Sequence, residues 1–221
     1  SRPFVVSARH LIQHPRAYRG FVRFDPAVSQ QVVTNRGKPE PGASAFDALI
    51  EQRREESQGV FTLRLRLEDP AQQAAFRFAP GQFNMLYLFG VGEVPISIAS
   101  DPRDHDHLEH TIRAVGRVTN GLAALAPGDR LGLRGPFGRG WPVAQARGQD
   151  LILITGGLGC APVVSMIHYL MRRRPEYGRL FILQGVACAD HLIWRSRFEW
   201  LSPVAPKAPA FMKFSEYWGE I

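Results

Sequence analysis

Residues 151–159, Leu151-Ile152-Leu153-Ile154-Thr155-Gly156-Gly157-Leu158-Gly159, join a short apolar run to a glycine-rich turn. Four consecutive apolar residues predict a strand that is buried on both faces, as in a parallel sheet. Residues 161–174 after the turn have the pattern of an amphipathic helix, and Leu180-Phe181-Ile182-Leu183 predicts a second buried strand. A strand, a glycine turn, a helix and a strand in this order form a βαβ unit.

The three glycines of this turn are Gly156, Gly157 and Gly159. Glycine lets the backbone turn tightly and approach a ligand without a Cβ in the way. The helix that follows offers unpaired N–H groups and a partial positive charge to a phosphate or another polar group. The spacing is not the full dinucleotide-binding fingerprint, so a strand-to-helix turn without a ligand remains the alternative.

The residues after Asp150 are too few for the roughly five strands of a complete doubly wound sheet. Asp190 is a good N-cap and predicts a second helix over residues 190–201, and residues 202–209 are too rich in proline to continue it. Either the nucleotide-binding domain is truncated, or residues between about 200 and 211 are missing.

Before Asp150 the pattern changes to short alternating segments separated by Gly, Pro and Asp. Residues 61–67 alternate strictly between apolar and polar side chains, as expected of a half-buried strand. Further strands are predicted at residues 84–89, 95–98 and 110–115, with one helix at 120–126. Several short strands at this spacing predict an antiparallel β-barrel.

The composition is that of an ordinary globular protein, with 45% hydrophobic and 21% charged residues, which argues against extensive disorder. The net charge of +7 favours anionic partners, but the basic residues form no stripe interleaved with aromatics, so we expect no nucleic-acid binding. No apolar run is long enough to cross a bilayer. Two cysteines, Cys160 and Cys188, cannot build a disulfide framework, which favours a reducing, cytoplasmic location.

Three motifs occur in a fixed order along residues 50–200: Gly92-Glu93-Val94-Pro95-Ile96-Ser97-Ile98, Arg134-Gly135-Pro136-Phe137-Gly138-Arg139-Gly140-Trp141-Pro142, and Gly156-Gly157-Leu158-Gly159-Cys160-Ala161-Pro162. With them the chain resembles the ferredoxin–NADP reductase superfamily. It is most similar to the FAD- and NAD(P)-binding gamma subunits of cytosolic nickel–iron (sulf)hydrogenases and to the related flavin subunit of anaerobic sulfite reductase. The resemblance implies a flavin-binding antiparallel β-barrel followed by a partial doubly wound nucleotide-binding domain.

The resemblance implies that the segment Val94-Pro95-Ile96-Ser97 holds FAD. Ser97 carries over as the catalytic residue that hydrogen-bonds flavin N5, and Ile96 as the apolar face against the ring. Val94 cannot bind phosphate, so Arg113 is the candidate for that role, because a guanidinium suits a pyrophosphate. The other cofactor-binding residues implied are Thr111, Ile112, Gly116, Val118 and Thr119. The alternatives are that Thr119 only caps a helix, that Arg113 is a solvated strand residue and that Ser97 bonds only to backbone.

On the nucleotide side the resemblance implies contacts from Gly156, Gly157, Gly159, Cys160 and Pro162. Cys160 matches a cysteine near the path of the hydride between nicotinamide and flavin, and it is the second catalytic candidate. A free cysteine is equally expected as a small buried hydrophobe.

Members of this branch usually carry four further cysteines that bind a [2Fe–2S] cluster. Cys160 and Cys188 do not have cluster spacing, so we expect no iron–sulfur cluster within residues 1–221. The choice between NAD and NADP stays open. Arg134 and Arg139 face either a nucleotide phosphate, an acidic partner or solvent. Three histidines lie close together in the sequence, at positions His105, His107 and His110. Such spacing is compatible with metal ligands, but we favour a solvated loop.

The predicted organisation is an N-terminal extension (1–49), an FAD-binding barrel (50–148), a partial NAD(P)-binding α/β domain (149–202) and a C-terminal tail (203–221). The predicted function is electron transfer between NAD(P)H and an iron–sulfur electron-transfer subunit of a hydrogenase-like complex, through FAD. The alternative is a non-catalytic FAD-containing relay. The extension is either a docking arm or a flexible tail, and the aromatic residues 211–218 either complete the core, which we favour, or cover the flavin.

Overall fold

The computed structural model describes residues 46–186, 191, 193–194 and the backbone of residues 210–213. The chain divides into two compact units, Ser1–Ala43 and Ser44–Ile221, and the described residues all belong to the second. Among the described residues, no helix combines the length and the apolar character that crossing a membrane requires.

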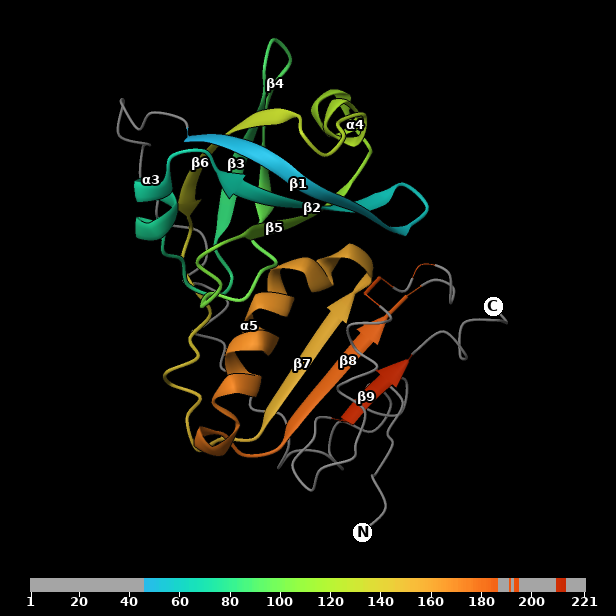
Figure 1. The fold of residues 1–221 in the computed structure, drawn as a ribbon. Helices are drawn as coiled ribbons and strands as arrows, with labels where there is room; N and C mark the ends of the chain where they lie inside the picture. The colour runs from blue at the N-terminus through green and yellow to red at the C-terminus, as the bar shows by residue number, and fades with distance from the viewer. Residues whose placement is uncertain (1–45, 187–190, 192, 195–209, 214–221) are drawn as a thin grey trace, which may run out of the picture. The chain divides into compact units, whose positions relative to one another are not determined.

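Six strands form one antiparallel sheet (Figure 1). They are β1 (Phe46–Ser57), β2 (Val60–Leu67), β3 (Phe83–Leu88), β4 (Gly92–Ser97), β5 (Leu108–Arg113) and β6 (Arg130–Phe137). Their order across the sheet is β4-β3-β6-β1-β2-β5, and a bridge between Ile98 and His110 joins the two outer strands. The sheet is therefore closed, and the predicted antiparallel barrel is confirmed.

The barrel core is aliphatic, as the alternation in β2 predicts. Phe61, Leu63, Leu65 and Leu67 are all buried, while Arg66 points outward and pairs with Glu51 at 2.6 Å. Leu86, Leu122 and Leu131 are fully buried in the same cluster. Removing this much apolar surface from water holds the strands in register.

Two short helices belong to the barrel: α3 (Pro70–Ala75) and α4 (Arg117–Ala123). The carboxylate of Asp69 caps α3 by accepting from the backbone N–H of Ala71 at 2.8 Å. Helix α4 begins three residues earlier than the predicted helix at 120–126, and the Thr119 hydroxyl in its first turn accepts from the backbone N–H of Gly116, the N-cap residue, at 2.9 Å.

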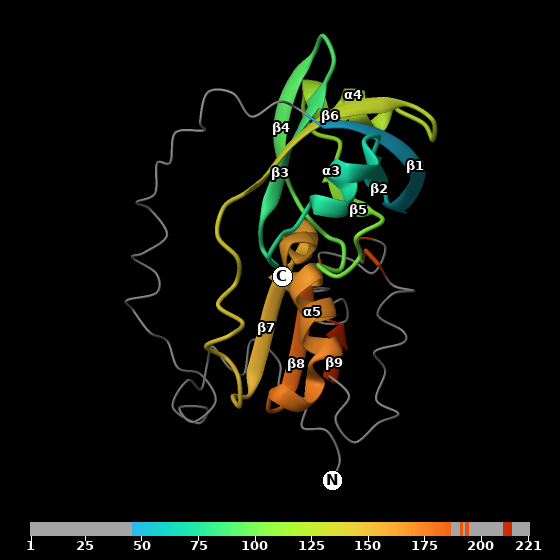
Figure 2. The same cartoon turned by 60° about the vertical axis from the view of Figure 1, so that its left-hand side comes forward.

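The second layer is a three-stranded parallel sheet, β7-β8-β9, with one helix alongside it (Figure 2). The elements are β7 (Leu151–Gly156), the 3₁₀ turn η2 (Gly157–Cys160), α5 (Ala161–Arg172), the 3₁₀ turn η3 (Arg174–Glu176), β8 (Leu180–Gly185) and β9 (Ala210–Lys213). The predicted βαβ unit is therefore confirmed. Helix α5 buries Val163, Val164, Ile167 and Leu170 in a cluster that also contains Leu153 and Ile182.

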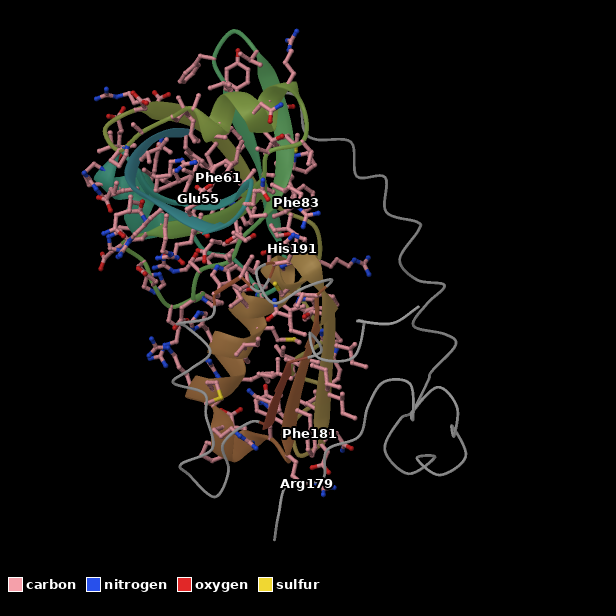
Figure 3. All side chains as sticks on the ribbon, turned by 90° about the vertical axis from the view of Figure 1, so that its right-hand side faces the viewer. Glu55, Phe61, Phe83, Arg179, Phe181 and His191 are labelled. Atoms are coloured by element: carbon pink, nitrogen blue, oxygen red, sulfur yellow. The ribbon has the colours of Figure 1, made fainter. Side chains whose placement is uncertain are left out.

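Arg179, just before β8, fastens the starts of the two strands. Its side chain donates to Asp150 at 2.6 Å, and its backbone N–H donates to the same carboxylate. Figure 3 shows Arg179 and Phe181 at the end of the sheet from which β7 and β8 start. At the opposite end of the sheet, β7 leads into the glycine-rich turn.

The structure differs from the sequence-based boundaries at three places. Strand β1 begins at Phe46, before the expected barrel start at residue 50. Its second half is charged and does not show the apolar–polar alternation by which strands were predicted. Strands β1 and β6 were not expected as strands. Residues 210–213, which we placed in a C-terminal tail, form β9 of the parallel sheet. The predicted helix at 190–201 and the extension at 1–45 lie outside the described residues, apart from positions 191, 193 and 194.

Candidate functional site

The first side of the candidate site is the end of β4. Val94, Ile96 and Ser97 are half-buried, and Pro95 is exposed. Strand β3 pairs with this segment through Asn84 opposite Ile96 and Phe83 opposite Ser97. The segment thus holds a defined extended conformation and keeps part of an isoleucine and a serine side chain accessible.

Arg113 ends the neighbouring strand β5 and is exposed. A Cβ built on Gly157 would lie 4.0 Å from an Arg113 Nη atom, so the guanidinium reaches the glycine turn. The two preceding residues point elsewhere: Ile112 is fully buried, and the Thr111 hydroxyl shares a buried 2.8 Å hydrogen bond with Thr62. Of the three neighbours predicted to contact flavin, only Arg113 presents its side chain to solvent.

Residues 115–119 form what we call the threonine turn. The Thr119 hydroxyl oxygen accepts from the backbone N–H of Val115 at 3.0 Å and of Gly116 at 2.9 Å, and the hydroxyl donates to the Gly116 carbonyl at 3.2 Å. Thr119 is buried, Val118 is half-buried and Val115 is 74% exposed. Thr119 therefore shapes this loop from within, and its direct contact with a pyrophosphate stays a prediction.

Residues 156–160 form what we call the glycine turn. Gly157 has φ +49°, a left-handed conformation that favours glycine. A Cβ built on Gly156 or on Gly159 meets no atom of the described residues within 4 Å, so among these residues open space lies over both glycines. No side-chain hydrogen bond caps η2 or α5. This turn leaves room for a ligand at the start of a helix.

Cys160 closes the glycine turn and is buried, with 2% exposure. Its Sγ donates to the Gly157 carbonyl at 3.0 Å and accepts from Gln184 Nε2 at 3.1 Å. Burial raises the pKa of the Cys160 thiol to about 12. The sulfur is thus a protonated group that braces the turn at neutral pH, and its place in the hydride path stays a prediction.

Pro162, a further predicted residue, joins the site through a neighbour. Pro162 is half-buried in the first turn of α5, and its carbonyl accepts from Trp141 Nε1 at 2.9 Å. Trp141 also packs on the Pro80–Gly81 loop, since a Cβ on Gly81 would lie 2.7 Å from its ring. The third sequence motif thereby meets the second at Trp141.

The arginines of the second motif differ in their surroundings. Arg134 donates to both carboxylate oxygens of Glu93, at 2.6 and 2.8 Å, and lies over the Phe137 ring at 5.9 Å. Arg139 is exposed. Because Arg134 is held by a partner on β4, its charge is already compensated within the barrel.

The histidines do not form a metal site: within the part of the chain that the structure describes, no group of three potential ligands is placed to hold an ion. His107 contacts Glu51 and Asp104 at 3.2 and 3.4 Å. The expectation of a solvated loop is wrong for His110, which is fully buried inside the barrel. An inward-facing position on β5, opposite Leu63 on β2, explains the burial.

Asn84 and His110 are the polar residues that the sequence reasoning did not assign. His110 Nδ1 donates to the Ser97 carbonyl at 3.0 Å, and Asn84 Nδ2 donates to His110 Nε2 at 3.3 Å. A carbonyl only accepts, so the proton of the neutral ring sits on Nδ1. A polar residue at an inward position of an alternating strand is the signal that would have found them.

The residues present fit a flavin and a nucleotide. Ile96 and the exposed Val115 offer apolar surface to a planar ring, Ser97 offers a hydroxyl, and Arg113 offers charge to a phosphate. The open space over Gly156 and Gly159 admits a second ligand beside Arg113. Dinucleotides are bound in this way at the carboxyl ends of parallel strands.

Comparisons with known proteins agree with this geometry. Residues 47–141 match the family described as oxidoreductase FAD-binding domain. The chain is 41% identical to the sulfhydrogenase 1 gamma subunit of Pyrococcus furiosus over 140 residues, which cover 63% of this chain and 48% of the relative. It is 39% identical over 127 residues to a probable dihydroorotate dehydrogenase B electron transfer subunit of Methanopyrus kandleri, covering 58% and 45%.

The chain therefore spans about half the length of the curated relatives it matches. Among solved structures, ferredoxin–NADP⁺ reductase of Plasmodium falciparum superimposes with a TM-score of 0.67 over 80% of this chain and 72% of that one, at 17% identity. This likeness shows the fold. Residues 47–141 therefore match the model of oxidoreductase FAD-binding domains, and the chain has a ferredoxin–NADP reductase fold.

Proposed function

We propose that the chain is the flavin-binding part of an electron-transfer subunit, which moves electrons between NADH or NADPH and an iron–sulfur partner. The observation that carries this proposal is the approach of Arg113 to Gly157, which puts the end of the barrel's strand β5 beside the glycine turn. Flavin on the barrel and nicotinamide at the turn would then meet at one place. The chemistry that bound FAD supplies is acceptance of a hydride's two electrons and their release one at a time.

On the barrel side, Ile96 packs against one face of the ring, and the Ser97 hydroxyl bonds its N5 edge. Arg113 neutralises the pyrophosphate, since a guanidinium forms paired, charge-assisted hydrogen bonds to phosphate oxygens. The threonine turn presents Val115 and Gly116 as the surface beside the cofactor. Its own hydrogen bonds through Thr119 keep that surface rigid before the cofactor binds.

On the nucleotide side, the glycine turn admits the nicotinamide half of NAD(P)H. Gly156 and Gly159 leave space that any side chain would occupy. Cys160 stabilises the turn through its hydrogen bonds to Gly157 and Gln184. The protein thus orients donor and acceptor and excludes water, and no general acid or base is needed for hydride transfer.

The names of the relatives support a partner subunit, because both the sulfhydrogenase gamma subunit and the electron transfer subunit are parts of larger assemblies by their printed names. We propose an iron–sulfur subunit next to a hydrogenase-like catalytic subunit as the partners. Residues 1–221 have cysteines only at 160 and 188, which do not have cluster spacing, and we propose that the partner provides the one-electron carrier.

The test is the absorption spectrum of the purified full chain with FAD, before and after anaerobic addition of NADH or NADPH. We expect a bound oxidised flavin absorbing near about 450 nm that is bleached by one of the two nucleotides. A chain that remains colourless with FAD contradicts the proposal. A chain that binds FAD and is bleached by neither nucleotide supports the non-catalytic relay instead.

A matched pair of arginine variants sharpens this test. Arg113→Ala is expected to weaken FAD binding at least about tenfold, because a charge-assisted bond to phosphate is lost. Arg130→Ala, which removes an exposed arginine paired with Glu68 at 2.8 Å on β6, is expected to leave FAD affinity unchanged. Equal FAD affinities in the two variants would remove Arg113 from the phosphate site.

A further inference from the structure

The interior of the barrel carries a polar pair that packing alone does not require. Asn84 on β3 and His110 on β5 are both fully buried beside the hydrophobic cluster of the barrel. A buried polar group destabilises a fold unless its hydrogen bonds are made, so an apolar pair of the same size would hold the barrel equally well. The pair therefore calls for a role besides stability.

The contacts of the pair lead to the candidate flavin segment. His110 Nδ1 donates to the carbonyl of Ser97 at 3.0 Å, and Asn84, which bonds to the ring, lies opposite Ile96 in the β3–β4 pair. Asn84 Nδ2 donates to the other ring nitrogen at 3.3 Å and so fixes the orientation of the ring. Ile96 and Ser97 are the residues whose side chains face the proposed flavin.

The surroundings also fix Asn84. Its side-chain oxygen has no hydrogen-bond partner among the described residues, and a Cβ on Gly135 would lie 2.2 Å from it. Gly135 has φ +149° and leaves the space that the Asn84 amide occupies. Gly135 belongs to the second sequence motif, and no predicted cofactor contact explains it. Its lack of a side chain makes room for the Asn84 amide.

We propose that His110 and Asn84 are positioning residues that set the height and angle of the Ile96–Ser97 backbone beneath the flavin. The inference rests on the proposed flavin site. The Asn84 amide holds the ring, the ring holds the Ser97 carbonyl, and the Ser97 hydroxyl meets flavin N5. Protonation at N5 differs between the oxidised and the reduced flavin, so the position of this hydroxyl weights the two states unequally.

Two amide substitutions at one position separate positioning from packing. In His110→Asn the amide nitrogen occupies the place of Nδ1 and still donates to the Ser97 carbonyl. In His110→Gln the amide occupies the place of Nε2, keeps the bond from Asn84 and loses the bond to Ser97. Both variants are uncharged and smaller than histidine, so a purely structural role would affect them alike.

The measurement is the reduction potential of FAD bound to the full chain, with the visible spectrum and the thermal midpoint of each variant recorded in parallel. We expect His110→Gln to change the ratio of FAD affinities in the two redox states about tenfold, which is about 30 mV for a two-electron couple. His110→Asn is expected to retain the potential of the parent chain. His107→Gln, at a surface histidine between Glu51 and Asp104, is the control and should change nothing.

The outcomes decide the inference in either direction. A folded His110→Gln chain with the parent potential, or equal shifts in the Gln and Asn variants, overturns it while leaving the flavin site intact. A parent chain that does not bind FAD overturns the proposed function and this inference together. If His110→Gln fails to fold, Asn84→Ser replaces it: a potential shifted from that of the parent chain supports positioning, and an unchanged potential overturns it.

Discussion

The threonine turn and the glycine turn each lead from a strand into a helix, but they use their backbone N–H groups differently. In the threonine turn, one hydroxyl accepts from two backbone N–H groups and donates to a carbonyl. In the glycine turn, no side chain caps the helix, and space is open over Gly156 and Gly159. The first turn is completed by its own side chain, whereas the second is left for a ligand.

The same contrast extends to what supports each turn. The barrel segment that contains Ser97 is supported by His110, a neutral histidine whose two ring nitrogens are both hydrogen-bonded. Behind the glycine turn stands a protonated thiol. The comparison teaches that the barrel side is rigid before any cofactor arrives, and that the nucleotide side owes its shape to the absence of side chains.

The largest expected effect is the acid sensitivity of the barrel side. Burial lowers the pKa of His110 from 6.5 to about 4, opposed by bonds to the Ser97 and Ile96 backbone and by the charge of Glu109. The unfolded chain therefore binds more protons between these values, and the free energy of unfolding falls as the pH drops from 6.5 to 4, by about 3 kcal/mol in total. Urea unfolding at a series of pH values measures this loss.

His110→Asn provides the control for that series, because its side chain does not titrate. We expect its stability to fall less steeply than that of the parent chain between pH 6.5 and 4, while the carboxylates contribute equally to both. Parallel curves would mean that His110 does not titrate in this range.

The next effect concerns the open space of the glycine turn. Gly159→Val places a branched side chain where a Cβ meets nothing within 4 Å, so the fold should tolerate it. We expect flavin reduction by NAD(P)H to slow about a hundredfold, about 2.7 kcal/mol of transition-state binding, with FAD affinity unchanged. Stopped-flow bleaching measures the rate. An unimpaired rate would place the nucleotide elsewhere.

Thr119→Val tests the closed turn. The variant keeps the shape of the side chain but leaves the Val115 and Gly116 N–H groups without their acceptor. We expect a loss of about 2 kcal/mol in the free energy of unfolding, measured in urea, and weaker FAD binding. Thr119→Ser retains the hydroxyl and should stay within about 0.5 kcal/mol of the parent chain. Similar losses in both variants would show that the methyl group, not the hydroxyl, matters.

The smallest effect is expected at Cys160. With its pKa raised to about 12, the thiol stays protonated at pH 8, so iodoacetamide should leave Cys160 unmodified in the folded chain. The experiment uses a Cys188→Ser background so that one thiol is followed, with urea-unfolded chain as the positive control. Rapid labelling of the folded chain would instead show that the Cys160 sulfur is accessible from the site.

Much of the fold could be predicted because local patterns determine it. The alternation of residues 61–67 and the apolar run 151–154 each correspond to a strand. The expectation that the second strand is buried on both faces is wrong, because Ile154 is 71% exposed. Strand β1 escaped prediction because its second half, Gln52–Ser57, is polar and lies in a ribbon beyond the core. Strand β9 escaped because a four-residue strand carries too short a pattern.

The candidate site could be predicted only where the type of a single residue indicates ligand binding. Glycine, serine and arginine in motif order indicate where ligands belong, and that placement stays a prediction. Residues 47–141 match the model of an oxidoreductase FAD-binding domain. The sulfur of Cys160 and the ring of His110 depend instead on what each meets across the fold. Gln184, which bonds to Cys160, and Asn84 and Ser97, which bond to His110, lie on other strands, and no spacing in the sequence encodes such a meeting.

The sequence by itself determined that an antiparallel barrel of short strands precedes a βαβ unit with a glycine turn, because hydrophobic periodicity and backbone freedom act over a few neighbouring residues. Tertiary structure alone decided that His110 is a neutral hydrogen-bond donor to Ser97 and that Arg113 reaches Gly157. Burial and long-range pairing set the proton of a histidine and the reach of a guanidinium, and both arise only when distant strands come together.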